Sequence, residues 1–254
     1  MLTVHAMTCG WMTMDLGSML EGETGKIKIP VPSYLIRHPR GLVLYDTGLH
    51  KSMQQTPDDR LGVLAPMFDI HYESNEDVAA RLAALDVDVS DISYLVNSHL
   101  HFDHCGGNDA IPNSPIVVQR KELEAAKDPE IAGTIGFFNQ DWDHGHDFIL
   151  ADGEYDIFSD GSVVCIPTPG HTPGHQSLKL TTNDSVTVLA GDACYLRRSL
   201  EELRLPALSY SPEQMLASFE KLKNLESKGA KIYYGHDPEF WRSLPQFPEA
   251  VISG

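Results

Sequence analysis

Short apolar runs in the first half of the chain alternate with turn residues and with stretches of helical spacing. Strands are predicted at residues 31–37, 42–46, 93–97 and 116–119, and helices at 75–86 and from about 120 to 127. Ser74 or Asn75 is the expected cap of the first helix. Residues 50–73, rich in Met, Pro and Asp, lack either pattern and predict a long irregular loop.

The second half repeats this rhythm. Strands are predicted near residues 162–167, 176–181, 185–190 and 231–234. Ser211-Pro212-Glu213 predicts the start of a helix, because Pro is favoured at the first helical position, and Gly229 predicts its end. Strands separated by helices in both halves predict an α/β fold of two sheets packed face to face with helices outside. One domain is expected over residues 1–254.

The net charge of the chain limits the classes of binding partner that can be expected. Asp and Glu number 36 against 19 Lys and Arg, for a net charge of −17. Such a surface repels phosphate backbones and anionic lipids, so neither nucleic acid nor a membrane is an expected partner. No apolar run approaches the roughly 18 residues of a membrane span, and the first basic residue is Lys26, which argues against a secretory signal. A cytoplasmic location is therefore expected.

The four cysteines, Cys9, Cys105, Cys165 and Cys194, form no Cys-x-x-Cys pair. They predict free, mostly buried thiols of a reducing compartment. Cys105 directly follows the motif described next, which places it near that motif without making it a preferred ligand.

The segment Ser98-His-Leu-His-Phe-Asp-His104 places three histidines and an aspartate just after an apolar strand. Because side chains alternate along a strand, His99 and His101 are expected to point the same way at its end. Asp103 and His104 then fall in the following turn, within reach of a second point. Imidazole and carboxylate groups are ligands that divalent metals prefer. A surface histidine cluster without metal is the alternative, but four residues at this spacing are more specific than a lone His-x-His pair.

Three further potential ligands lie beside glycine at predicted strand ends. They are His171 in Pro169-Gly-His-Thr-Pro-Gly-His175, Asp192 after Gly191, and His236 after Gly235. Glycine allows the backbone to approach a crowded centre without a side-chain clash. Together with the first segment, these residues are enough to hold two metal ions.

This arrangement of His99, His101, Asp103 and His104, followed by His171, Asp192 and His236, resembles the metallo-β-lactamase superfamily along the whole chain. The resemblance implies an αβ/βα four-layer sandwich of two mixed sheets with metals at their edge. It implies one metal on His99, His101 and His171, a second on Asp103, His104 and His236, and Asp192 as a bridge. Two Zn²⁺ ions are expected, with Co²⁺, Mn²⁺ or Fe²⁺ as alternatives. His175 matches no ligand position and is interpreted as a supporting histidine.

Longer stretches are similar to the N-acyl-homoserine lactonases, quorum-quenching enzymes that open the lactone ring of bacterial signals. The matching stretches are residues 99–107, 115–120, 168–177, 192–195 and 235–237. The resemblance implies a carboxylic ester hydrolase acting on a small-molecule lactone, with Tyr195 contacting the substrate carbonyl. Family members are often dimers, so a homodimer is an alternative to a monomer. Residues 50–73 and 136–148 show least of the family pattern and are expected to shape the pocket.

A metal pair about 3.5–4 Å apart can share a hydroxide, because coordination lowers the pKa of water toward about 7. This bridging hydroxide is expected to attack the lactone carbonyl, with Tyr195 and one metal stabilising the carbonyl oxygen. Asp103 is the candidate proton carrier for the leaving alkoxide.

Several side chains outside this set are assigned supporting roles. Met12, Met14, Met19, Leu20 and Phe102 are candidates for an apolar wall around an acyl chain, with core packing as the alternative. Asp46 is expected to brace the site through hydrogen bonds. His144 and His146 are expected to be exposed or to line the pocket.

Other readings of the motif remain open. A lactonase for another small lactone, or a glyoxalase II-like thioester hydrolase, would carry the same motif. Glyoxalase II enzymes usually bind an anionic glutathione group with a basic C-terminal segment, whereas residues 240–254 contain only Arg242 as a basic group. A flavodiiron reductase would carry Glu at the position of His101, and the net charge of −17 disfavours an RNA-processing nuclease. A mono-iron persulfide dioxygenase shares ligands and would differ in metal count. A metal-stabilised binding protein without activity is the non-enzymatic alternative.

Overall fold

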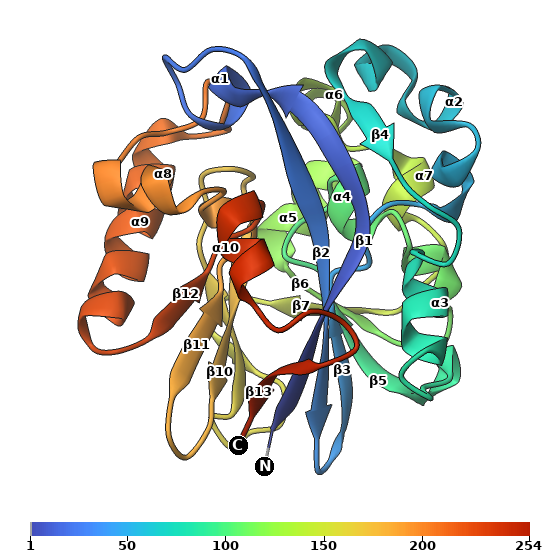
Figure 1. Cartoon of the computed structure of the whole chain (residues 1–254), viewed down its shortest axis with the longest axis vertical. Helices are drawn as coiled ribbons and strands as arrows, with labels where there is room; N and C mark the ends of the chain where they lie inside the picture. The colour runs from blue at the N-terminus through green and yellow to red at the C-terminus, as the bar shows by residue number, and fades with distance from the viewer. Residues whose placement is uncertain (1) are drawn as a thin grey trace.

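A computed structural model describes residues 2–254, and two mixed β-sheets form its centre (Figure 1). The strands are β1 Thr3–Asp15, β2 Lys26–His38, β3 Gly41–Tyr45, β4 Asp69–His71, β5 Ile92–Val96, β6 Ile116–Gln119, β7 Phe148–Ala151, β8 Tyr155–Asp156, β9 Val163–Pro167, β10 Gln176–Thr181, β11 Val186–Leu189, β12 Lys231–Tyr233 and β13 Ala250–Ser253. The larger sheet runs β13-β1-β2-β3-β5-β6-β7, with β4 paired to β1, and the smaller runs β12-β11-β10-β9-β8. The pairs β3–β5, β5–β6, β6–β7 and β11–β12 are parallel and the others antiparallel.

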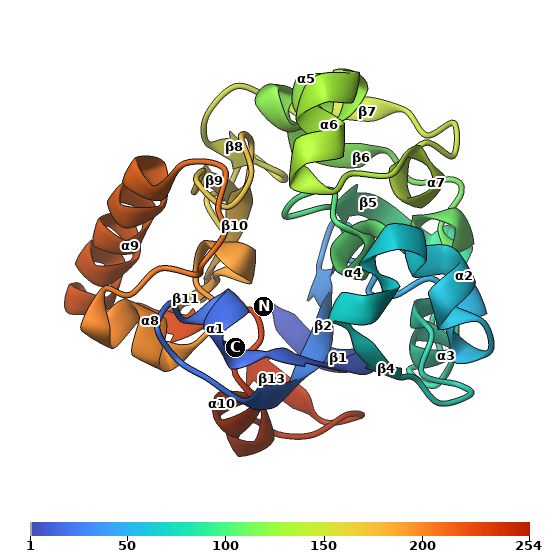
Figure 2. The ribbon, with the colours of Figure 1, turned by 90° about the horizontal axis from the view of Figure 1, so that it is seen from above.

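Helices cover the outer faces of both sheets. They are α1 Leu16–Met19, α2 Pro57–Leu61, α3 Val78–Ala83, α4 Phe102–Cys105, α5 Arg120–Lys127, α6 Pro129–Ile135, α7 Asn139–Trp142, α8 Arg197–Glu202, α9 Pro212–Ser227 and α10 Pro238–Ser243. Shorter 3₁₀ turns are η1 Lys51–Gln54, η2 Gly62–Met67, η3 Val89–Asp91, η4 Asn108–Ala110 and η5 Gly191–Ala193. Figure 2 shows α8 and α9 outside the smaller sheet and α3, α5 and α6 outside the larger one, which is the predicted four-layer α/β sandwich.

The alternation of side chains along β3 shows why two sheets stack. Val43 and Tyr45 face the smaller sheet and pack among its buried residues, whereas Leu42 and Leu44 face the helical layer that contains α3 and α5. On the other side, α9 buries Met215, Phe219 and Leu222 at helical spacing against the smaller sheet. Apolar residues at both periodicities therefore build one core between the sheets and one under each helical layer.

Several predicted elements match the structure closely, among them β6, β10 and α5, but two predictions were wrong. Residues 50–73 are not an irregular loop, since they form η1, α2, η2 and β4. Helix α3 begins only at Val78, capped by Asp77 rather than by Ser74 or Asn75. Asn75 has a left-handed φ of +69°, which no helix can include, so the chain turns there before the helix starts.

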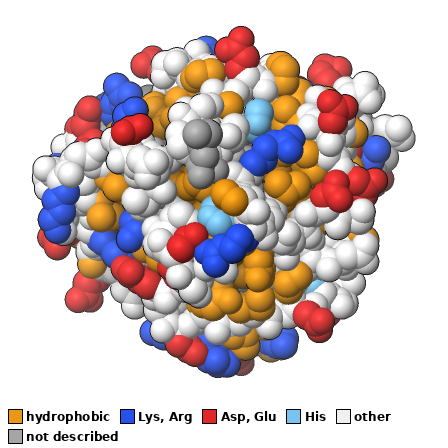
Figure 3. Space-filling model, turned by 90° about the horizontal axis from the view of Figure 1, so that it is seen from below, with side chains coloured by type: hydrophobic (Ala, Val, Ile, Leu, Met, Phe, Trp, Pro, Cys, Tyr) orange, Lys and Arg blue, Asp and Glu red, His pale blue; other side chains and the backbone are white. Residues whose placement is uncertain are grey.

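The surface and the thiols agree with the composition. On the face drawn in Figure 3, acidic side chains are interspersed with basic ones and do not gather into one patch. The four cysteines are buried and, within the described residues, free, as predicted. No helix formed by residues 2–254 is both long and apolar enough to cross a bilayer.

Candidate metal centre

The candidate ligands lie on loops that leave four strands at one edge of the sandwich. His99, His101 and, within α4, Asp103 and His104 follow β5, His171 follows β9, Asp192 follows β11 and His236 follows β12. The predicted reason for the convergence of His99 and His101 was wrong, because β5 already ends at Val96. The two side chains meet through the loop that leads into α4, with His101 at the cap position of that helix.

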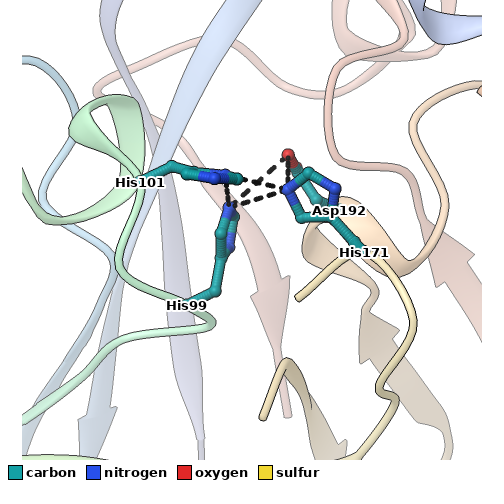
Figure 4. A group of neighbouring side chains, drawn as sticks. All are labelled: His99, His101, His171 and Asp192. Carbon is teal, nitrogen blue, oxygen red and sulfur yellow. Dashed lines mark hydrogen bonds and ion pairs between the residues drawn. The ribbon is translucent and has the colours of Figure 1, made fainter. Parts of the chain in front are cut away.

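The first group of ligand atoms comes from three histidines. His99 Nε2 lies 2.9 Å from His101 Nδ1, and His171 Nε2 lies 3.2 Å from the former and 2.9 Å from the latter (Figure 4). Three nitrogens from two distant parts of the chain therefore surround one point.

The second group comes from α4 and the loop after β12. His104 Nε2 lies 3.3 Å from His236 Nε2. Asp103 Oδ2 lies 3.4 Å from the first of these nitrogens and 3.6 Å from the second. All three side chains are buried.

Asp192 lies between the two groups. Its Oδ2 is 3.4 Å from His171 Nε2 and 3.7 Å from His99 Nε2. Its Oδ1 is 3.0 Å from His236 Nε2 and 3.2 Å from His104 Nε2. This buried Oδ1 accepts no well-formed hydrogen bond from residues 2–254. One carboxylate thus faces both groups, one oxygen to each.

The outer nitrogen of each histidine faces an oxygen, and a carbonyl or carboxylate oxygen at this place requires an N–H donor. His101 Nε2 donates to the Ile135 carbonyl at 2.7 Å, and His236 Nδ1 donates to the Pro30 carbonyl at 2.8 Å. The remaining pairs are His104 Nδ1 with Asp46 Oδ2 at 2.9 Å, His99 Nδ1 with Ser98 Oγ at 2.9 Å, and His171 Nδ1 with the Tyr195 hydroxyl at 2.9 Å. A neutral imidazole has a single N–H, so wherever that proton lies on the outer nitrogen, the inner nitrogen presents a lone pair to the centre.

Converging lone pairs and an unpartnered carboxylate oxygen fit a pair of divalent cations. In a tetrahedral site with metal–nitrogen bonds of about 2.0–2.1 Å, neighbouring nitrogens lie about 3.3–3.4 Å apart. The separations of 2.9–3.2 Å within the first group are close to this value. Lone pairs cannot hydrogen-bond to one another, so a cation at each point would satisfy groups that otherwise repel. The structure brings together all seven residues predicted as ligands, as two clusters suited to metal binding.

Burial and neighbouring charges shift the pKa values of the histidines in this centre in opposite directions. Burial lowers the pKa of His99 and of His171 well below the ordinary value, which keeps both rings neutral. Burial also opposes the charged form of His104, but Asp192, Asp103 and Asp46 raise its pKa well above the ordinary value. The second group therefore attracts positive charge, whether from protons or from a metal ion.

Asp46 braces the centre from behind, as predicted. Its Oδ1 accepts from the Ser98 N–H at 2.7 Å, and its Oδ2 accepts from the Ser98 hydroxyl at 2.8 Å and from His104 Nδ1 at 2.9 Å. The carboxylate is buried and its backbone has a left-handed φ of +58°. Such hydrogen bonds orient metal-binding histidines and raise their basicity.

Glu122, which the sequence analysis did not identify, links the two loops of the first group. It lies on α5 and is fully buried. Its Oε1 accepts from the Leu100 N–H at 3.1 Å, and its Oε2 accepts from the Thr172 hydroxyl at 2.9 Å and the Gly174 N–H at 2.8 Å. One carboxylate therefore joins the loop of His99 and His101 to the loop of His171.

Four other positions named from the sequence, three histidines and one cysteine, lie outside the ligand groups. His175 is buried and supports the centre, since its Nε2 accepts from the Asp192 N–H at 3.0 Å. Cys105 is buried with its Sγ 3.3 Å from the His101 carbonyl. His144 is exposed, and His146 is partly buried beside α7, with its Nε2 3.0 Å from the Ile111 carbonyl.

An apolar pocket of about 360 Å³ opens beside the centre. His101, Asp103, His171, Asp192, Tyr195 and His236 form its polar end. Its apolar wall comprises Met12, Met14, Met19, Ile29, Val63, Leu64, Met67, Phe68, Phe102, Ile135, Phe138 and Leu208. The predicted wall is thus present, except that Leu20 packs into the core and does not line the pocket.

Both segments expected to shape the pocket contribute to it. Residues 63, 64, 67 and 68 come from the first, and Gly136 and Phe138 from the second. Residues 143–148 lie elsewhere, beside α7 and β7, so only the beginning of the second segment has that role.

Comparison with known proteins agrees with this geometry. Residues 28–236 match the family model of the metallo-beta-lactamase superfamily. The chain therefore belongs to the metallo-beta-lactamase superfamily.

Within that superfamily the chain is similar to lactonases. It is 34% identical over 237 residues to N-acyl homoserine lactonase AttM of Azorhizobium caulinodans, covering 91% of this chain and 90% of that protein. It is also 34% identical over 229 residues to N-acyl homoserine lactonase AiiA of Bacillus thuringiensis subsp. kurstaki, covering 89% and 88%. A solved structure of N-acyl homoserine lactone hydrolase, with the product N-hexanoyl-L-homoserine at its catalytic metal centre, superposes with a TM-score of 0.88 at 30% identity over 98% of both chains.

Proposed function

We propose that this protein is a metal-dependent hydrolase that opens the lactone ring of N-acyl-homoserine lactones, and so quenches quorum signals. The observation that carries the proposal is the apolar pocket whose polar end is the histidine and aspartate cluster. An acyl-homoserine lactone has the matching shape, with an apolar tail and a polar ring that carries the ester. The similarity of this protein to AttM and AiiA, both N-acyl homoserine lactonases, supports the same substrate class.

We propose zinc as the metal of both sites. His99, His101 and His171 would hold one ion, Asp103, His104 and His236 the other, and Asp192 both. When bound, such a pair lowers the pKa of water toward about 7 and polarises a carbonyl group. The nitrogen-rich first group suits Zn²⁺, and elemental analysis after expression with defined metals would test this choice.

Tyr195 is proposed to stabilise the oxygen of the substrate carbonyl. With a metal ion on His171 Nε2, the ring proton would lie on Nδ1 and donate to the Tyr195 oxygen, which is 2.9 Å away. The hydroxyl proton of Tyr195 is therefore free to donate into the pocket, which this side chain lines. A donor fixed at this point stabilises the charge that develops on the carbonyl oxygen during attack.

Asp103 is proposed to carry the proton to the leaving alkoxide. Burial alone would raise its pKa, but His104 and His236 lower it below the ordinary value, so the carboxylate is ionised. It lines the pocket next to Asp192 and can accept a proton during attack and return it after ring opening.

The test is hydrolysis by the zinc-reconstituted protein, followed by mass spectrometry. The panel contains N-acyl-homoserine lactones, simple γ- and δ-lactones and S-lactoylglutathione. Addition of one water to the acyl-homoserine lactones, with little reaction of the thioester, is the expected result. Cleavage of the thioester alone would contradict the proposal. A homodimer and a cytoplasmic location stay predictions, which light scattering and cell fractionation would check.

A further inference from the structure

Two segments far apart in the sequence form one side of the pocket. Residues 63, 64, 67 and 68 come from η2 and the residue that follows it, and residues 136 and 138 come from the turn before α7. Both segments lie within residues 50–73 and 136–148, which were expected from the sequence to shape the pocket. This side of the pocket is therefore built where these segments meet.

Packing holds η2 only in part, because Leu64 and Ala65 contact the hydrophobic core but are only partly buried. Across residues 62–67, all within the described chain, no side chain is buried. Val63 is 84% exposed and Leu208, across the pocket mouth, is 75% exposed. A short turn of this kind takes its position from its neighbours, and its nearest neighbour in the chain is α2, which ends at Leu61.

Arg60 joins α2 to α7 through an ion pair with Asp141. Arg60 Nε and Nη2 lie 3.0 and 2.8 Å from Asp141 Oδ1. Arg60 Nη2 also donates to the Gln140 carbonyl, and Gln140 Nε2 donates to the Arg60 carbonyl at 3.0 Å. Within residues 2–254, each hydrogen bond between segments 50–73 and 136–148 involves Arg60.

The pair is shielded from water, unlike most arginine pairs of this protein. The Asp141 side chain is 2% exposed and that of Arg60 is 15% exposed. By contrast, Arg40 and Asp160 are 52% and 38% exposed. An exposed pair exchanges readily with water and fixes little, whereas a buried charge with several donors tolerates few arrangements. The contact thus holds the two segments in one relative position.

We infer that the Arg60–Asp141 pair determines acyl-chain specificity by fixing the outer wall of the pocket against the distal carbons of a long chain. This inference rests on the proposed lactonase function. The pair lies outside the metal centre and touches no candidate ligand, so it acts as a positioning contact. A short acyl group is expected to end near Phe102 and the metal cluster, before it reaches η2. Long chains should therefore depend on the pair, and short chains should not.

The test compares KM and kcat for butanoyl- and dodecanoyl-homoserine lactone. Arg60→Gln and Asp141→Asn are each expected to raise KM for the dodecanoyl substrate about five- to tenfold. The expected change for the butanoyl substrate is less than about twofold. The double variant should be no worse than either single one, because both remove the same contact. Arg40→Gln, which breaks an exposed pair at another place, should leave both substrates unchanged.

Equal changes for both substrates, or no change in folded variants, would overturn the inference. If Arg60→Gln and Asp141→Asn fail to fold, Gln140→Ala removes one hydrogen bond of the same contact from an exposed side chain and should give a smaller shift in the same direction. If the wild type opens no acyl-homoserine lactone, the proposed function fails. Hydrogen exchange then still tests the contact, since Arg60→Gln should speed exchange in residues 57–68 and 136–142, and unchanged exchange would refute it.

Discussion

The carboxylate of Asp46 orients a candidate ligand without belonging to either ligand group. In Asp46→Asn the amide group must face a donor, either the Ser98 N–H or His104 Nδ1. We expect metal affinity to fall by about 10–100-fold, because the ring orientation and basicity of His104 depend on this contact. Competition with a coloured chelator would measure it. Asp86→Asn is the matched control, because Asp86 also has a left-handed φ, +56°, but is exposed. Equal affinity in both variants would contradict the bracing role.

The Tyr195 hydroxyl contacts His171 Nδ1 and is proposed to donate to the substrate carbonyl, so its removal should affect two measurements unequally. Tyr195→Phe is expected to lower kcat for lactone opening by about 10²–10³-fold, because a donor to the carbonyl oxygen is lost. Metal content should fall much less, since His171 keeps its ring and loses only the acceptor on Nδ1. Steady-state kinetics beside elemental analysis would separate the two effects. Tyr210→Phe, at an exposed tyrosine, should change neither. A kcat that falls only in proportion to metal content would argue against contact with substrate.

Glu122 is expected to make stability depend on pH. Burial raises its pKa from 4.5 to about 7, despite hydrogen bonds that favour the ionised form. Between these pH values the folded state keeps a proton that the unfolded state loses, so stability falls as pH rises, by about 3 kcal/mol for this group. The side chain of Glu122→Gln cannot ionise, so the stability of this variant lacks this dependence on pH. Urea unfolding of the metal-free proteins should show the variant gaining about 3 kcal/mol on the wild type between pH 4.5 and 7. The control Glu124→Gln, exposed on the same helix, should follow the wild type.

At the scale of elements, the loop of His171 is packed tightly against α5. A Cβ added at Gly174 would lie 2.2 Å from the Glu122 backbone nitrogen. We expect Gly174→Ala to lower the free energy of unfolding by about 1–3 kcal/mol, because the loop and the helix must separate. Chemical denaturation would measure the loss. Gly133→Ala in α6 is the control, because its methyl group would meet no atom of the described chain within 4 Å and alanine favours a helix. A neutral Gly174→Ala would show that the loop can move freely.

Elements with a strong local pattern could be predicted from the sequence, and the others could not. Strands β6 and β10 and helix α5 match their predicted ranges because compact apolar runs and helical spacing define them. Strand β1, with 13 residues, was not predicted, since a bulge between Thr8 and Trp11 interrupts its alternation. The helices, turns and strand within residues 50–73 span only 3–6 residues each, which is too few to show a helical or strand periodicity.

The candidate site, too, could be predicted from the sequence only in part. Histidines and aspartates beside glycine in tight spacing were identified from the sequence, because few other roles need that pattern. Glu122 was not, because it lies on a charged helix beside Lys121 and looks like a solvated residue. Its partners are 22 residues away at Leu100 and 50 residues away at Thr172. Only the packing of α5 against two loops brings them together.

At the scale of the whole molecule, the candidate centre draws on both sheets. His99, His101 and His104 follow a strand of the larger sheet, whereas His171, Asp192 and His236 follow strands of the smaller one. A bound ion would therefore cross-link the halves of the sandwich and stabilise the folded state by mass action. Chelation should lower the Tm by about 5–10 °C, and added Zn²⁺ should restore it. His171→Ala should show a smaller change. A Tm indifferent to chelator would contradict metal binding across the sheets.

The same thermal scans bear on the domain prediction. One domain over residues 1–254, of which Met1 lies outside the described residues, stays a prediction. A single domain should unfold in one cooperative transition, and the midpoint of that transition should shift when metal is removed. Two transitions that respond differently to chelator would argue for separately folding parts.

The pairing of β1 with β13 has a practical consequence for immobilising the protein. Leu2 and Gly254 exchange backbone hydrogen bonds of 2.6 and 3.0 Å, so the two ends of the described residues lie side by side (Figure 1). They lie at the opposite end of the molecule from α1, α4 and α6, which border the pocket. A bead, fusion partner or affinity tag attached at either end would therefore leave the mouth of the pocket open to dissolved signal molecules.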